Sequence, residues 1–220
     1  MKLKHIIIIV ILFLFASFGN NTNAQSNFFV EENKTFYGGL LAGFNFATID
    51  NDNFTQYNKV GINAGAVVYI LFTNHLAASM EMLYSEKGRV SHDLVATGIQ
   101  GVNFTEIHTT LKYAEIPIMI NYFDRKQGIF GIGLSYCRLI NSSDYMTTDP
   151  YVYIDPTKYP FNKEDIELLI GGQLHLKNNF YLTIRFQISV AEIRNRVPTD
   201  FYPTEQYNNL WVLRLMYLFK

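Results

Sequence analysis

Residues suited to nucleophilic, acid–base or metal chemistry are few in this chain, and their spacing matches no catalytic motif. The sequence contains five histidines and one cysteine, Cys137. His75 and Ser79 lie on one expected strand, where four residues span about 13 Å at ~3.3 Å per residue. Ser91 and His92 fall in an expected loop without a fixed partner, and the histidines are scattered without metal-ligand spacing. We therefore expect no enzyme, no metal site and no cofactor.

The acidic segment DNDN, at residues 50–53, is the one stretch that suggests calcium. Its side chains offer the oxygen ligands that calcium prefers, but it lacks the glycine and the distal glutamate of a calcium-binding loop. Both a weak calcium site and a solvated loop tip fit this composition, and the loop tip needs fewer assumptions.

The charged residues of most interest lie inside otherwise apolar, alternating stretches. In YLTIRFQISV, residues 181–190, every second residue is apolar and Arg185 stands at the centre of the polar face. Strict alternation of this length is the period of a β-strand. Glu81, Glu115 and Arg214 occupy comparable positions in other stretches. In a membrane barrel the apolar faces meet lipid, so these charges would line the interior.

Counted from the ends of their stretches, these four charged residues fall near mid-height on opposite walls of a barrel. An eight-stranded barrel is narrow enough for arginine to reach across it. We therefore expect Glu81, Glu115, Arg185 and Arg214 to form a charge network with bidentate arginine–carboxylate pairs. The alternative is that each charge meets water in the lumen or a neighbour on its own wall.

Eight alternating stretches follow one another after residue 24, and none is an apolar run long enough for a membrane-spanning helix. Each is close to the ~9–11 residues that a tilted strand needs to cross a bilayer, and an even number suits a bacterial barrel. The expected strands cover residues 37–48, 59–71, 75–87, 109–122, 128–140, 165–176, 181–190 and 209–219. The predicted fold is all-β, an eight-stranded antiparallel up-and-down transmembrane β-barrel.

The connections between these strands alternate in length. The short ones are residues 72–74, 123–127 and 177–179, and the long ones are residues 49–58, 88–108, 141–164 and 191–208. Membrane barrels place short turns in the periplasm and long loops outside. Aromatic residues near the short turns would then form an interfacial girdle, although β-propensity alone also enriches strands in aromatics. The expected girdle is Tyr37, Phe72, Tyr122, Phe123, Phe180, Tyr217 and Phe219.

Pro117 interrupts the expected strand at 109–122, because proline cannot donate a hydrogen bond to the ladder. We expect a one-residue bulge at residues 114–116 to accommodate it. Such a bulge would place Tyr113 on the lipid side together with the isoleucines that follow it, and would leave Glu115 free to point inward.

The first 24 residues have the pattern of a secretory signal peptide. Two lysines precede an apolar core at residues 6–16, and small residues ending at Ala24 resemble a cleavage site. An uncleaved anchor is the alternative. The net charge of −1 gives no indication of nucleic-acid binding. A single cysteine excludes an intrachain disulfide. Residues 25–220 are expected to form one barrel domain in the outer membrane, in contact with its lipid.

Five stretches carry a family resemblance: YGGLLAGFNFA, MEMLYSEKG, YAEIPIMINY, GIFGIGLSY and the ending LRLMYLFK. They resemble the outer-membrane β-barrel domain family of Bacteroidetes, often called PorT-like, most strongly over Glu81–Gly88 and Tyr113–Tyr122. The resemblance implies an eight-stranded outer-membrane barrel. It implies little about activity, because barrel motifs alone do not transfer function. The chain departs from the pattern at its end, where Lys220 follows the aromatic residue.

The long connection at 141–164 is rich in tyrosine and proline, which suits binding of an envelope protein or a glycan. Alternatively, its rings pack over the mouth of the barrel. The candidate residues are Tyr145, Tyr151, Tyr153, Tyr159 and Phe161. We expect a structural or interaction protein of the outer membrane, including membership of an envelope or secretion complex. The alternative function is a small lipid- or ligand-handling barrel, with or without enzymatic activity.

Overall fold

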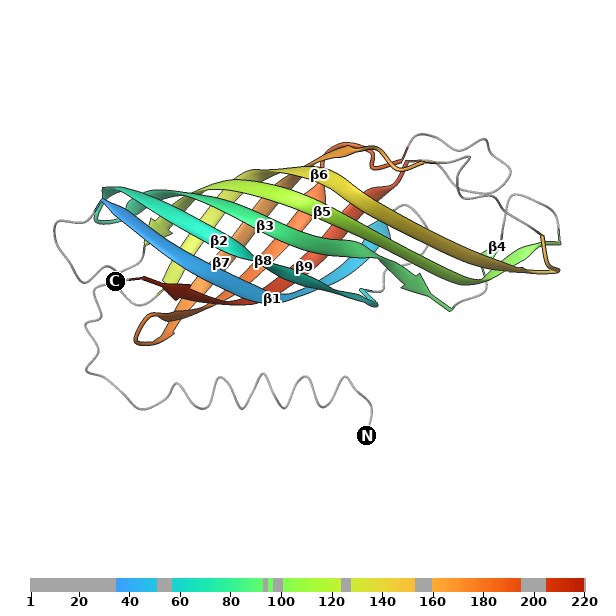
Figure 1. Ribbon diagram of the computed structural model, residues 1–220, viewed down its shortest axis with the longest axis horizontal. Coiled ribbons are helices and arrows are strands. Elements are labelled where there is room, and N and C mark those ends of the chain that lie inside the picture. Colours follow the sequence, from blue (N-terminus) through green and yellow to red (C-terminus); the bar gives the residue numbers. More distant parts are fainter. Residues whose placement is uncertain are drawn as a thin grey trace.

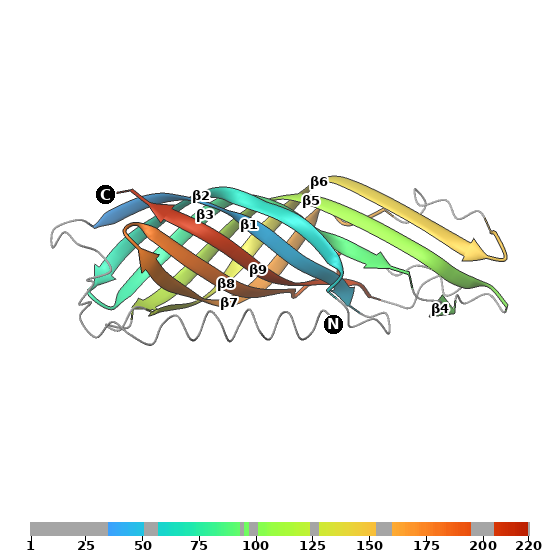
Figure 2. The same cartoon turned by 90° about the horizontal axis from the view of Figure 1, so that it is seen from below.

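Eight long antiparallel strands close into one barrel (Figures 1 and 2). The computed structural model describes residues 35–50, 57–92, 95–96, 101–123, 128–152, 160–194 and 205–219. The long strands are β1 (Phe36–Asp50), β2 (Lys59–Thr73), β3 (Leu76–Ser91), β5 (Asn103–Phe123), β6 (Gly128–Asp149), β7 (Glu164–Lys177), β8 (Phe180–Ser189) and β9 (Tyr207–Leu218). A two-residue strand, β4 (Val95–Ala96), pairs with β5. The predicted fold class is confirmed.

The ring closes because the first and last strands pair with each other. β1 pairs antiparallel with both β2 and β9, and β3 pairs with β5 directly. We call the end that carries the β2–β3 and β7–β8 turns the turn end, and the opposite end the loop end. The C-terminal end of β9 lies at the turn end (Figure 1). Over the described part of the chain, no helix combines the length and apolarity that membrane crossing would require.

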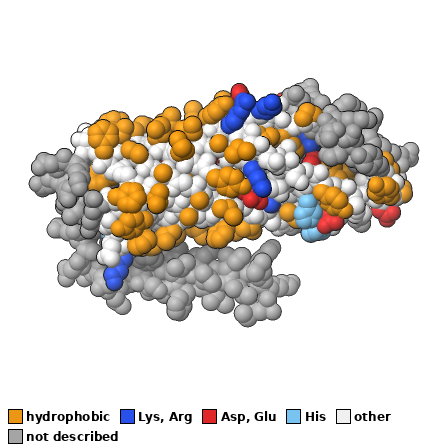
Figure 3. Space-filling view, in the orientation of Figure 1, with side chains coloured by type: hydrophobic (Ala, Val, Ile, Leu, Met, Phe, Trp, Pro, Cys, Tyr) orange, Lys and Arg blue, Asp and Glu red, His pale blue; other side chains and the backbone are white. Residues whose placement is uncertain are grey.

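The alternation in each strand decides which side chains face outward. In β8, Ile184 leaves 44% of its surface exposed, whereas the neighbouring Arg185 leaves 1%. Hydrophobic side chains spread over the strands from the turn end to mid-barrel, while most charged side chains gather toward the loop end (Figure 3). An apolar outer wall around a polar interior is the arrangement of a membrane barrel, so the apolar faces meet lipid.

A belt of charged residues ends this apolar band toward the loop end. Lys59 and Glu86 pair across β2 and β3, with 2.9 Å between Nζ and Oε1. Arg138 and Glu164 pair across β6 and β7, and Lys112 of β5 lies beside Glu86 in the register. From this belt to the turn end, each strand has about the length that crosses a hydrocarbon core, ~9–11 residues.

Three strands continue beyond the belt, so the loops predicted at 88–108 and 141–164 are wrong over much of their length. β5 and β6 remain paired as far as Asn103 and Asp149. We call residues 103–111 and 139–149 the β5–β6 ribbon; it reaches farther than the other strands (Figure 1). Polar residues are mixed into both of its faces, so alternation did not indicate a strand, although the backbone still pairs. Nine residues of strand span roughly 30 Å at ~3.3 Å each.

The predicted bulge at Pro117 is also wrong. The β3–β5 pairing is interrupted between Met80↔Ile118 and Leu83↔Glu115 but resumes in the same register. The ladder therefore loses hydrogen bonds beside Pro117 without an inserted residue. The register shift nearest to Pro117 lies between Lys112 and Tyr113 of β5, where Ile140 is an extra residue on β6. Tyr113 consequently faces the interior and is fully buried.

The aromatic girdle predicted at the turn end is partly wrong. Tyr37 and Phe123 are buried, because they share the inward parity of their strands. The remaining predicted members are exposed on the outer wall: Phe72, Tyr122, Phe180, Tyr217 and Phe219. Phe180 and Tyr217 pack against each other with ring centroids 5.0 Å apart. The outer aromatics are thus in the position expected of interfacial residues, and two of the seven instead fill the lumen.

Candidate functional site

The turn end of the lumen is closed by an apolar cluster. Tyr69 lies at its inner edge, where its hydroxyl is 3.0 Å from Oε1 of Gln173. The cluster also contains Tyr37, Leu41, Val67, Ala77, Leu83, Phe123, Ile129, Tyr181, Met216 and Leu218. These residues come from strands all around the ring, so the inward parity of each strand is enough to bring them together. The lumen is therefore filled at this end.

Above this layer, one carboxylate from β3 binds two arginines from the opposite wall. Arg185 Nη2 and Nη1 donate to Glu81 Oε1 and Oε2 at 2.5 and 3.1 Å. Arg214 Nη1 donates to Glu81 Oε2 at 3.0 Å and to the side-chain oxygen of Asn63 at 3.2 Å. Because all three charged groups are buried, these bonds replace the water that each group loses on folding.

A second charged group lies closer to the loop end and has the reverse composition. Lys87 Nζ is 2.7 Å from Glu167 Oε2 and 3.2 Å from Glu115 Oε2. Gln187 joins the two carboxylates by donating to both, at 2.8 Å each. The thiol of Cys137 lies 3.4 Å from Lys87 Nζ. All of these side chains are buried, so the group has no access to bulk solvent.

The two groups balance each other in formal charge. Glu81 with Arg185 and Arg214 has one positive charge in excess. Lys87 with Glu115 and Glu167 has one negative charge in excess. Neither group is neutral alone, but together they are, which reduces the cost of burying six charges in a lumen without bulk water.

The structure brings together three of the four predicted network residues and places the fourth elsewhere. Glu81 contacts Arg185 and Arg214, whereas Glu115 contacts Lys87, Gln187 and Ser135. The predicted pairing of Glu115 with an arginine is therefore wrong. Glu115 lies opposite Leu83 in the β3–β5 register, and the side chain of Lys87 reaches it from four residues farther along β3. Counting residues within each strand does not reveal that contact.

Sequence reasoning missed Lys87 and Glu167 as network members. Each lies on the polar face of a correctly located strand, so the sequence already indicated that both side chains point inward. Their partners were not indicated, because a pair that is 80 residues apart depends on how the ring closes. Charge balance gave no signal either, because two carboxylates and two guanidinium groups are already neutral, and adding Lys87 and Glu167 leaves the sum unchanged.

The loop end is closed by a second apolar cluster, and a predicted binding residue belongs to it. Phe161 is buried there with Ile49, Leu111, Tyr113, Cys137 and Ile193. Arg194 lies over the Phe161 ring, with Cζ 3.8 Å from the centroid, and its Nη2 is 2.6 Å from Asp144 Oδ2. For Phe161 the alternative of packing over the barrel mouth is thus the correct one.

The other aromatic residues of the predicted binding loop have different surroundings. Tyr145 lies within β6 rather than in a loop, and it is exposed, as is Tyr151 just beyond the strand. Tyr153 and Tyr159 lie outside the described residues, as do the signal peptide expected at 1–24 and most of the DNDN segment.

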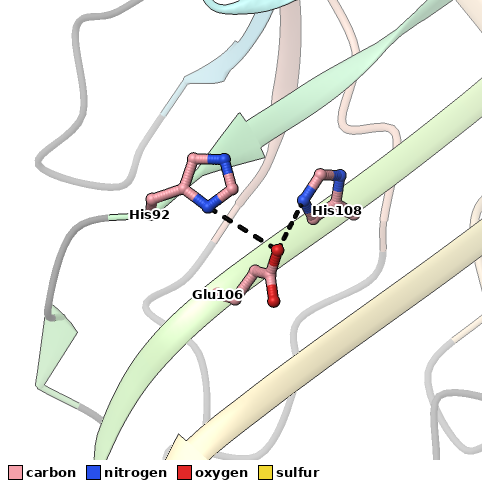
Figure 4. A group of neighbouring side chains, drawn as sticks. All are labelled: His92, Glu106 and His108. Carbon is pink, nitrogen blue, oxygen red and sulfur yellow. Dashed lines mark hydrogen bonds and ion pairs between the residues drawn. The ribbon is translucent and has the colours of Figure 1, made fainter.

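The described residues contain an exposed group of metal-type ligands that sequence spacing did not reveal. His92 follows the last residue of β3, and Glu106 and His108 lie on the same face of β5. Both imidazoles reach toward one carboxylate oxygen (Figure 4): Glu106 Oε1 is 3.0 Å from His108 Nε2 and 3.6 Å from His92 Nδ1. The expectation of scattered histidines is wrong for these two, because β3–β5 pairing brings them together.

Comparison with known proteins gives one family and several similar folds. Residues 23–194 match the family model described as outer membrane protein beta-barrel domain. Ail, the attachment invasion locus protein of Yersinia pestis, aligns over 84% of this chain and 100% of its own, with 13% identity and a TM-score of 0.44. Neisserial surface protein A aligns over 84% and 98%, with 13% identity and a TM-score of 0.43. OprG from Pseudomonas aeruginosa aligns over 84% and 94%, with 11% identity and a TM-score of 0.37. No curated protein matches the chain.

Proposed function

Because this chain belongs to the outer membrane protein beta-barrel domain family, we propose that it is a non-conducting, non-enzymatic interaction protein of the bacterial outer membrane. The barrel itself is an outer-membrane protein with its apolar wall in lipid. In the proposed role, the lumen transports nothing, and the surface at the loop end binds another envelope component or a glycan outside the cell.

The filled lumen is the observation that carries this proposal. Apolar clusters close both ends, and the two charged groups occupy the space between them. A solute crossing the barrel would have to break buried ion pairs and displace packed rings. Lys87, Glu115, Cys137 and Glu167 are the side chains best suited to acid–base or nucleophilic chemistry, and burial keeps all four from a substrate.

The β5–β6 ribbon supports the contact role. It rises beyond the charged belt, and Tyr145 on it exposes 56% of its surface. An exposed tyrosine on a paired backbone is a rigid aromatic contact, of the kind that is enriched in binding surfaces. Membership of an envelope or secretion complex would be one use of such a surface.

Two measurements test the proposal. First, purified protein inserted into planar bilayers should give no stepwise conductance. Second, a photo-crosslinking amino acid at Tyr145 should give protein or glycan adducts in living cells. The matched control is Ile132, also on β6 and 55% exposed, which faces lipid and should give none. Stable conductance steps, or adducts at neither position, would contradict the proposal.

We further propose that the chain falls within the PorT-like group of Bacteroidetes and that residues 1–24 are removed on export. The segments Glu81–Gly88 and Tyr113–Tyr122 support the first point, since they carry the resemblance and contain Glu81, Lys87 and Glu115. Exchanging both segments for those of a PorT-like barrel should preserve folding, and exchange with an unrelated barrel should not. Mass spectrometry of the exported protein should find Gln25 at its N-terminus.

A further inference from the structure

We propose that His92, Glu106 and His108 form a zinc-binding site on the outside of the barrel at its loop end. This inference goes beyond the proposed function and does not depend on it. Among the described residues, two groups have three potential metal ligands within 4.8 Å of one another: this one, and Glu115 with Cys137 and Glu167.

The buried group already contains a cation and is therefore excluded. Lys87 Nζ lies 2.7 Å from Glu167, 3.2 Å from Glu115 and 3.4 Å from Cys137. The ammonium group thus occupies the position from which a metal ion would have to contact the same three ligands. In the exposed group, by contrast, the ion pairs join only its own two histidines and one carboxylate, which leaves the central position to an ion.

The β-ladder holds the three ligands on one face. Ser91 pairs with Ile107, and Val90 pairs with His108. His92 therefore lies at the level of Glu106, while Glu106 and His108 are two residues apart and point the same way. Ser91 and Ile107 are buried, so the opposite parity of the three ligands directs them outward. Both strands are already beyond the charged belt here, which places the site outside the membrane.

The distances suit a small adjustment to metal coordination. Tetrahedral zinc with bonds of ~2.0–2.1 Å separates its ligand atoms by about 3.3 Å. The two contacts to Glu106 Oε1 are 3.0 and 3.6 Å, and the histidine rings lie 5.4 Å apart between centroids. The His92 side chain is 68% exposed, so its ring is free to turn toward a shared ion.

The types of ligand select the ion. Two imidazoles with one carboxylate suit zinc, whereas calcium and magnesium prefer oxygen ligands alone. Three protein ligands leave a fourth position open to water or to a ligand from a partner molecule. Bound zinc would also tie the end of β3 to β5 at the point where the chain leaves the ladder.

The test is calorimetric titration of the tag-free, refolded full chain in detergent with zinc chloride. We expect one zinc ion per chain. The double variant His92→Ala/His108→Ala should weaken binding at least tenfold, as should Glu106→Gln, which keeps the size of the side chain but removes its charge. The matched control is His75→Ala/His175→Ala, which removes two histidines at the turn end and should bind like the native protein.

Heat-modifiable migration on gels must first show that each variant folds. For a surface site we expect a dissociation constant on the order of micromolar. If the native chain binds no zinc at about 100 µM, well above that constant, the proposal is wrong. An equal loss of zinc affinity in the His75→Ala/His175→Ala control would also overturn it, since binding would then be non-specific. Unchanged binding by Glu106→Gln would overturn the three-ligand site.

Discussion

Arg185 in β8 holds both carboxylate oxygens of Glu81 in β3, on the far side of the lumen, at 2.5 and 3.1 Å. The two strands are opposite each other in the ring order, so this pair joins walls that no backbone hydrogen bond connects. Arg214 shares the same carboxylate. Glu81 is thus the common anchor of two cations, and the predicted consequences of removing the three residues are unequal.

We expect Glu81→Gln to destabilise the barrel more than Arg185→Met. Loss of Glu81 leaves two buried guanidinium groups without a counter-charge, which costs about 3–5 kcal/mol. Loss of Arg185 leaves Glu81 still bound to Arg214. The free energy of unfolding in urea, followed by the fluorescence of the single tryptophan, Trp211, measures both effects in detergent or lipid.

A double-mutant cycle should then show coupling between Glu81 and Arg185 of at least ~1 kcal/mol. The matched control is Arg138→Met, which removes the arginine of an exposed pair on the outer belt and should cost no more than ~1 kcal/mol. Additive effects of Glu81→Gln and Arg185→Met would show that the cross-lumen pair contributes no stability of its own.

Removal of Lys87 alone should destabilise the barrel more than removal of Lys87 together with one of its partner carboxylates. Lys87→Met leaves Glu115 and Glu167 without their cation, for which we expect a loss of about 3–5 kcal/mol. Adding Glu167→Gln removes the repulsion between the two carboxylates and should restore part of the lost stability. Urea unfolding of the three proteins decides the order. A double variant less stable than Lys87→Met would contradict this account of the group.

Gly133→Ala should impair closure of the barrel. A Cβ atom at Gly133 would lie 2.1 Å from the backbone oxygen of Ile118 on β5, and backbone has no rotamer by which to avoid it. We expect at least about 1–3 kcal/mol of destabilisation, with a reduced heat-modifiable band on gels. Gly128→Ala is the matched control on the same strand, since its Cβ would meet only Phe130, at 3.5 Å. Equal behaviour of the two variants would contradict the close approach.

Cysteine labelling should establish which end faces the outside. Cys137 is buried, so the folded native protein should not react with a membrane-impermeant maleimide. We expect Tyr145→Cys and Tyr151→Cys to be labelled in intact cells, because both positions are exposed at the loop end. Lys177→Cys, beside the β7–β8 turn, should be labelled only after permeabilisation. The opposite pattern would invert the orientation.

The local part of this structure was determined by the sequence alone. Alternation located all eight long strands, and it correctly directed Arg185 inward and the isoleucines of β8 outward, because side-chain direction in a strand repeats every two residues. It failed for Tyr113, where a bulge was expected at Pro117, and for the ribbon, where polar residues on both faces remove the periodic signal.

Only the tertiary structure decided which inward residues meet. Ring closure and strand shear set the relative heights of opposite walls, and neither is encoded in any single strand. They separate Glu115 from the arginines and bring Glu167 of β7 to Lys87 of β3. In the same way, extension of the β3–β5 pairing places His92 beside Glu106 and His108. The sequence determines the face on which each residue lies; the pairing of strands determines its neighbours, because those contacts join residues far apart in the chain.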